Sequence, residues 1–186
     1  MTLLVVGITV PTLNDAESVS EMADALSERQ SDVISFFISF AVIGRYWLAH
    51  HQFISLLRSM DAGLVGLNLV YLGFIAFLPF PTALLGIYFE NPLSVVVYAT
   101  AVSIVSGMEV VLFRHAYRAR LLSRQMPEEI FRWGARQSLS PLAFFALSIP
   151  LAFWSTTVAV ASWALMIPFQ MVTHRWKPEH ADEYLN

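Results

Sequence analysis

Long apolar runs separated by short polar segments cover most of the chain. A helix rises ~1.5 Å per residue, so crossing a hydrocarbon layer about 30 Å thick takes roughly 20 predominantly apolar residues. Five runs come close to or exceed that length, at residues 33–57, 62–85, 93–113, 139–154 and 156–173. They predict five membrane-spanning helices, the fourth being short and containing Pro150.

The opening segment, residues 1–11, is apolar but too short to cross a membrane alone. It has no basic region before it, so we do not interpret it as a cleaved signal peptide. It is typical of the outer half of a first helix, whose inner half would precede Met1. The sequence therefore predicts a single all-α domain over residues 1–186, a polytopic membrane protein with six transmembrane helices and a partial first helix.

Composition supports this fold class. Apolar residues make up 56% of the 186 positions and charged residues 13%, whereas about 25% of the residues in a soluble domain are charged. The chain has no cysteine, which excludes disulfides and thiolate chemistry.

The basic residues predict the orientation in the membrane. Nine of the eleven Lys and Arg residues lie on alternate connections: Arg58, six arginines in the loop 114–137, Arg175 and Lys177. Because cytoplasmic loops are enriched in Lys and Arg, we expect this loop and both chain ends to be cytoplasmic. The segments 12–31 and 88–91 would then lie outside, and segment 15–30 could form a short surface helix.

Four polar residues within the predicted spans form a candidate site. Counting along each helix places Arg45, His50, Asn68 and Glu109 at one level in the inner half of the membrane. Ionisable groups at this depth are costly unless they face protein or water. We therefore expect a polar interhelical network, although Arg45 and the histidines could instead extend toward the cytoplasmic headgroups.

Other chemistry has little support in the sequence. His50 and His51 are adjacent and point about 100° apart on a helix, which argues against a shared zinc site. No GxSxG, HExxH or Gly-rich phosphate loop occurs, and no TVGYG filter of the P-loop channels. We predict neither catalysis, nor a cofactor, nor a bound metal, nor nucleic-acid binding. Several aromatic residues are expected as anchors at the membrane interfaces: Tyr46, Trp47, Tyr88, Trp154 and Trp176.

The partial first helix carries a stripe at helical spacing, formed by Thr2, Leu3 and Val6. From the residues alone, such a stripe is more typical of a lipid-facing surface or core filler than of a functional face.

The motif SFAVIGRYWLAHHQF at residues 39–53, together with Asp61, Asn68 and PFPT at 79–82, resembles the transmembrane protein 175 family of potassium channels, in particular its bacterial members. MTLLVVGITVP at 1–11 is similar to the outer end of that family's first helix. The family's RxxxFSD signature is absent, and its position would precede Met1.

The resemblance implies a homotetramer in the cell membrane, surrounded by lipid, with potassium as the permeant ion. The first helix of each subunit would line the pore and carry a hydrophobic constriction. The stripe of Thr2, Leu3 and Val6 would then face the ion path. One alternative is a secondary transporter or proton-coupled carrier using Glu109 and His50; another is a membrane enzyme using the histidine pair, for which no partner motif is present.

Overall fold

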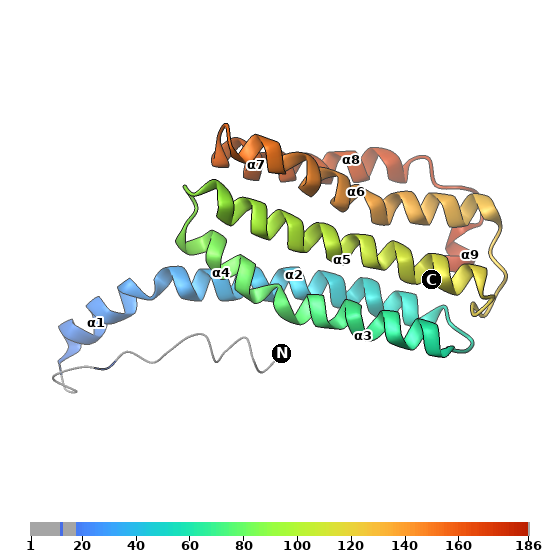
Figure 1. Cartoon of the computed structure of the whole chain (residues 1–186), viewed down its shortest axis with the longest axis horizontal. Helices are drawn as coiled ribbons and strands as arrows, with labels where there is room; N and C mark the ends of the chain where they lie inside the picture. Colours follow the sequence, from blue (N-terminus) through green and yellow to red (C-terminus); the bar gives the residue numbers. More distant parts are fainter. Residues whose placement is uncertain (1–11, 13–17, 186) are drawn as a thin grey trace.

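The computed structural model describes Thr12 and residues 18–185, and this part of the chain consists of helices and short connections (Figure 1). The prediction of an all-α fold is confirmed. The helices are α1 (Val19–Glu28), α2 (Gln30–Ser55), α3 (Ala62–Phe77), α4 (Pro79–Ile87), α5 (Pro92–Arg118), α6 (Glu128–Ala152), α7 (Thr156–Ser162), α8 (Met166–His174) and α9 (Ala181–Leu185), with a 3₁₀ turn η2 (Trp163–Leu165) joining α7 to α8.

Helix α5 lies at the centre of the bundle (Figure 1). It packs along α6 on one side and against α3 and α4 on the other. Small and β-branched side chains allow these close approaches, and several of those on α5 are fully or almost fully buried: Val95, Ala99, Val102, Val105 and Ala116. Side chains at three- and four-residue spacing fall on the same faces of α5 and form the core of the fold.

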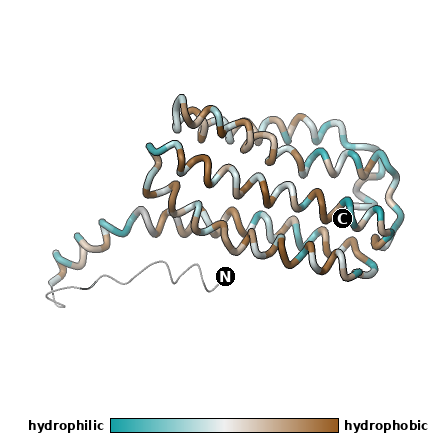
Figure 2. Tube along the Cα trace, viewed as in Figure 1, coloured by the Kyte–Doolittle hydropathy of each residue, from teal (hydrophilic) through white to brown (hydrophobic). Residues whose placement is uncertain are grey.

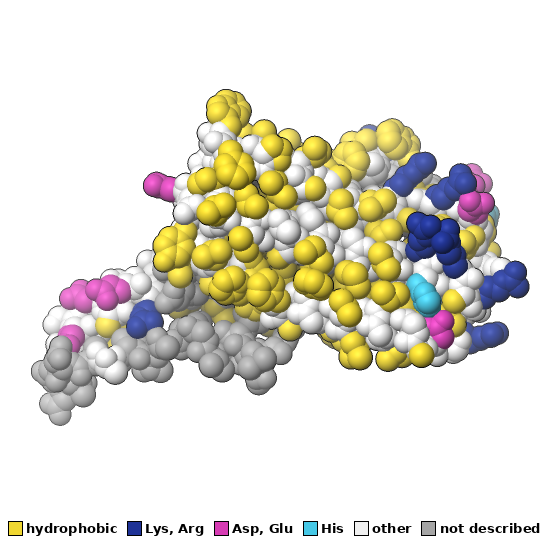
Figure 3. Space-filling model, viewed as in Figure 1, with side chains coloured by type: hydrophobic (Ala, Val, Ile, Leu, Met, Phe, Trp, Pro, Cys, Tyr) yellow, Lys and Arg dark blue, Asp and Glu magenta, His cyan; other side chains and the backbone are white. Residues whose placement is uncertain are grey.

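The apolar surface of the bundle agrees with a membrane setting. Figure 2 shows hydrophobic positions along the middle of the long helices, and Figure 3 shows Lys and Arg gathered mainly at one end. By length and hydropathy, three described helical stretches could cross a membrane: Ala62–Ile87, Pro92–Arg118 and Thr156–His174. Helices α2 and α6 fall outside that criterion, so the full number of spans remains a prediction.

Helix ends differ from the apolar boundaries. The predicted span 62–85 is interrupted at Leu78, where Pro79 begins α4. Helix α5 continues beyond its apolar run to Arg118, and α6 begins at Glu128, so much of the segment 114–137 is helical. The short helix α1 agrees with the helix expected within 15–30. It carries no buried residue, and Figure 1 shows it extending away from the bundle.

The end of α5 is closed by a tight backbone motif. The amide of Leu121 donates to the carbonyl of Ala116 at 2.9 Å, and the amide of Arg120 donates to Tyr117 at 3.3 Å. This is a Schellman arrangement, in which glycine usually occupies the left-handed position. Here Arg120 occupies it, with φ of 55°, a conformation that costs an L side chain roughly 1 kcal/mol.

The same turn is fixed to the connection between α2 and α3. The amide of Arg58 donates to the carbonyl of Leu121 at 2.8 Å, and the amide of Ser123 donates to the carbonyl of Leu56 at 2.8 Å. These bonds flank an isolated antiparallel bridge between Leu57 and Leu122. Two connections far apart in the sequence therefore form one unit at the basic end of the bundle.

Candidate functional site

The predicted pore-lining residues Thr2, Leu3 and Val6 lie outside the described residues. The candidate site that the structure describes is the polar level within the helical bundle. It is built by α2, α3 and α5.

His50 on α2 and Asn68 on α3 form the first contact at this level. Nε2 of His50 lies 2.6 Å from Oδ1 of Asn68. Because an amide oxygen can only accept, this geometry assigns the imidazole proton to Nε2. Both side chains are half-buried. The bond joins two helices and pairs two polar groups, as an apolar membrane interior would require.

Tyr71 extends this contact to α5. Its ring stacks on the imidazole of His50 with centroids 5.4 Å apart, and its hydroxyl donates to Oε1 of Glu109 at 3.0 Å. Tyr71 has no exposed surface. Asn68, His50, Tyr71 and Glu109 therefore form a continuous polar chain across three helices.

A second link between α2 and α5 lies one helical turn away. The hydroxyls of Tyr46 and Ser106 are 2.8 Å apart and both side chains are buried. The expectation that Tyr46 anchors the chain at a membrane interface is therefore wrong. Tyr46 was assigned to the interface because its aromatic ring and polar hydroxyl suit that position; a hydroxyl partner on α5 makes an interior position equally suitable.

Arg45 is the predicted member that joins no described hydrogen bond or ion pair. It is exposed on α2, yet it lines the same cavity as His50, Tyr71 and Glu109. This cavity has a volume of about 450 Å³ and lies between these helices and the facing sides of α6 and α8, where Gln137 and Gln170 line it. Its size and polar lining suit several water molecules.

The far wall of the cavity is also hydrogen-bonded. Thr173 donates to Oε1 of Gln137 at 3.0 Å, and the amide of Gln170 lies 3.2 Å from the hydroxyl of Ser140. Within the described residues, no three His, Asp or Glu side chains come close enough to share a metal ion. Most of the hydrogen-bonding groups named on these walls are therefore paired, with Arg45 as the exception.

A further pair at the basic end was not anticipated. Asp61 caps α3 by accepting from the amide of Leu64 at 2.6 Å, and Nε2 of His115 lies 3.0 Å from both carboxylate oxygens. The amide of Leu64, followed by His115, holds the pKa of Asp61 below its ordinary value. The spacing Asp61-x-x-Leu64 is a capping signal, but the contact with α5 depends on tertiary packing.

Comparison with known proteins adds a second line of evidence. The family described as endosomal/lysosomal potassium channel TMEM175 matches residues 1–79. A potassium channel of Streptomyces collinus is 34% identical over 105 residues, covering 56% of this chain and 50% of that protein. A potassium channel of Chamaesiphon minutus is 35% identical over 129 residues, covering 67% of this chain and 63% of that protein.

The fold has a solved counterpart. The crystal structure of a lysosomal potassium-selective channel TMEM175 homolog from Chamaesiphon minutus matches with a TM-score of 0.70 and 26% identity, covering 92% of this chain and 89% of that chain. The chain spans less than two thirds of the length of the two curated relatives.

Proposed function

We propose that this chain, a homologue of the TMEM175 family of potassium channels, forms a potassium-permeable channel in the cell membrane. The observation that carries the proposal is the combined likeness: both curated relatives are potassium channels, and the likeness to the solved channel extends over nearly the whole chain. A family that forms membrane channels also agrees with the apolar helical stretches.

We propose that four copies of the chain surround one central pore, and that the first helix of each copy lines it. Thr2, Leu3 and Val6 would face the ions, and branched apolar side chains would form the constriction. Such a constriction offers no coordinating oxygens, so passage requires partial dehydration. Potassium loses water more readily than the smaller sodium ion, and a ring of Thr2 hydroxyls would supply compensating oxygens. The expected selectivity for potassium is moderate.

The polar chain has a supporting role in this proposal. Hydrogen bonds joining α2, α3 and α5 hold three helices in a fixed arrangement against which a pore-lining helix can pack. Arg45, His50, Asn68 and Glu109 are thus assigned to the interhelical network and not to ion coordination.

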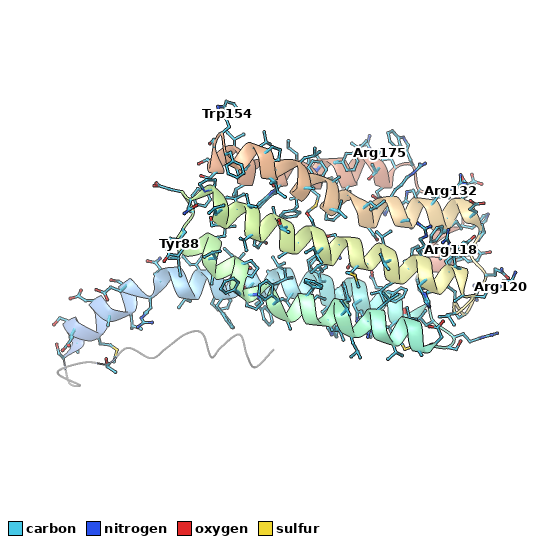
Figure 4. All side chains as sticks on the ribbon, in the orientation of Figure 1. Tyr88, Arg118, Arg120, Arg132, Trp154 and Arg175 are labelled. Carbon is cyan, nitrogen blue, oxygen red and sulfur yellow. The ribbon has the colours of Figure 1, made fainter. Side chains whose placement is uncertain are left out.

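The orientation we propose places the basic end of the bundle in the cytoplasm. Arg118, Arg120, Arg132 and Arg175 lie toward this end, whereas Tyr88 and Trp154 lie at the other (Figure 4). Both chain ends would be cytoplasmic, following the enrichment of Lys and Arg on that side of membranes.

The direct test is ion flux through the purified protein in liposomes. Potassium should move faster than sodium under equal gradients, and the rate should rise nearly linearly with potassium concentration. Empty liposomes provide the background. Absence of flux for both ions would contradict the channel proposal.

The hydrogen bond between Tyr71 and Glu109, at the edge of the cavity, favours one second candidate, a proton-coupled carrier. A carrier would show flux that saturates with potassium and follows an imposed pH gradient. Glu109→Gln would abolish that coupling in a carrier. In the proposed channel it would leave the response to a potassium gradient in place, since the carboxylate lies off the ion path.

A further inference from the structure

The two connections that join at the basic end enclose a second hollow, of about 410 Å³. We propose that it binds a dianionic phosphate group, held by the guanidinium groups of Arg58, Arg118 and Arg120. The lining also includes Tyr117 and Gln125. The inference concerns binding and does not depend on ion conduction.

The charge of this hollow is uncompensated. No acidic residue lines it, and within the described part of the chain none of its three arginines forms an ion pair. Two described acidic side chains on neighbouring segments have other partners, since Asp61 contacts His115 and Glu183 contacts His180. Three positive charges around one hollow attract an anion strongly, particularly near a low-dielectric membrane.

A different hollow, also lined by arginines, contains acidic residues as well. Arg132 and Arg136 line it together with Glu128 and Glu129, and Arg132 pairs with Glu128 at 2.7 Å. There the positive charge is neutralised by the protein itself. General enrichment of basic residues at the cytoplasmic face accounts for that arrangement, but it does not require three arginines without an ion pair to line one hollow.

The hollow is also built on a fixed backbone. Hydrogen bonds between Arg58 and Leu121, and between Ser123 and Leu56, hold the two connections together. The position of Arg120 is the most informative feature, because its left-handed backbone suits glycine better. An arginine at a position where glycine would cost less free energy suggests a role for its side chain.

The arrangement fits a dianionic phosphate monoester better than a monoanionic diester. Guanidinium groups donate paired, charge-assisted hydrogen bonds to phosphate oxygens. Three arginines carry three positive charges. A diester with one negative charge would leave two of them unmatched, and a monoester with two negative charges would leave one. Gln125 and the hydroxyl of Tyr117 offer further donors. The group could come from the headgroup of phosphatidic acid or from free phosphate in the cytoplasm.

The test measures binding to the purified full chain in neutral detergent. The probes are dioctanoyl phosphatidic acid, dioctanoyl phosphatidylglycerol and inorganic phosphate. Phosphatidic acid should bind about tenfold more tightly than phosphatidylglycerol. Arg58→Gln and Arg120→Gly should each weaken its binding by about tenfold or more. Arg175→Gln removes the same charge at the same end of the bundle but outside the hollow, and should change affinity less than twofold.

Arg120→Gly separates binding from folding. Glycine suits the left-handed position, so this variant should melt at the wild-type temperature or above while losing affinity. If inorganic phosphate binds as tightly as phosphatidic acid and displaces it, free phosphate is the source of the bound group. If only phosphatidic acid binds, the source is the membrane. The proposal is overturned if neither phosphatidic acid nor inorganic phosphate binds, if Arg120→Gly keeps full affinity, or if Arg175→Gln weakens binding as much as Arg58→Gln.

Discussion

At the scale of single residues, Tyr71 links polar groups from two other helices inside an apolar bundle. Its ring contacts His50 and its hydroxyl contacts Glu109, so one buried side chain serves partners on two other helices. His50, Asn68, Tyr71 and Glu109 each have a partner, which is the condition for placing such groups in an apolar membrane interior.

The contribution of His50 can be tested against its neighbour. His50→Ala removes the hydrogen bond to Asn68 and the stack on Tyr71, and should lower stability by about 1–3 kcal/mol. His51→Ala makes the same chemical change at an exposed position, where the ring stacks only on Trp47, and should cost about 0.5 kcal/mol or less. Thermal melting in detergent measures both. Equal loss in the two variants would show that the polar chain does not stabilise the bundle.

Asp61 should make stability depend on acid pH. Its pKa is lowered in the folded state, so its contribution is complete above the unfolded pKa of about 3.9 and disappears as pH falls through the lower folded value. Asp61→Asn retains a capping side chain, whereas Asp61→Ala removes the cap as well. Both variants should melt below wild type at pH 6, with alanine lower, and the gap between wild type and asparagine should close below about pH 4. A constant gap across that range would contradict this role.

The sequence analysis proposed four residues for a polar interhelical network. Arg45, His50, Asn68 and Glu109 were selected because charged or amide groups are conspicuous in apolar runs, and counting helical rise placed them at one level. The structure joins His50 to Asn68 and brings Glu109 to Tyr71. Tyr71 itself was missed, because tyrosine is compatible with both an interior and an interface, and only the rotation of α3 relative to α5 decides between them.

At the scale of the helices, the fold depends on how closely α5 can approach its neighbours. Gly107 faces α6, and a Cβ at this position would lie 3.1 Å from Cδ1 of Leu142. Gly73 on α3 has no atom within 4 Å of the equivalent point. The two glycines therefore differ in the space around them and not in backbone conformation, since both lie within helices.

Valine at these two positions should have opposite effects. Gly107→Val forces α5 away from α6 and should cost about 1–3 kcal/mol through overpacking. Gly73→Val adds a side chain in open space and should be neutral or slightly stabilising, because glycine is a poor helix former. Melting temperature of each purified variant measures the difference. Equal melting temperatures would mean that the packing of α5 on α6 tolerates an added side chain.

The sequence predicted that the long helices exist more readily than it predicted where they end. Apolar runs report only the portion of a helix that meets lipid, so they could not show that α5 continues to Arg118 or that α6 begins at Glu128. Beyond the lipid, backbone hydrogen bonds and packing alone decide where a helix ends. The interruption at Leu78 was not predicted, although proline favours the start of a helix and Pro79 begins α4.

At the scale of the whole molecule, the two ends of the bundle differ in chemistry. Arg118 and Arg120 mark one end, and Tyr88 and Trp154 mark the other, where Trp154 is 80% exposed (Figure 4). An exposed tryptophan beside apolar surface suits the boundary between lipid and water, and clustered arginines suit the cytoplasmic face. This polarity predicts one orientation in the membrane.

The orientation can be tested by cysteine labelling, because the chain has no cysteine and the wild type gives no background. Ser59 lies in the connection between α2 and α3, and Glu90 lies between α4 and α5; both are exposed and stand at opposite ends of the bundle. In right-side-out membrane vesicles, a membrane-impermeant maleimide should label Glu90→Cys at once and Ser59→Cys only after permeabilisation. Maleimide labelling of both cysteine variants in detergent shows that each cysteine is able to react. The reverse pattern would place the basic end outside. The proposed phosphate site would then face the exterior, where it would meet neither cytoplasmic phosphate nor the inner leaflet, because the connection that carries Ser59 also carries Arg58.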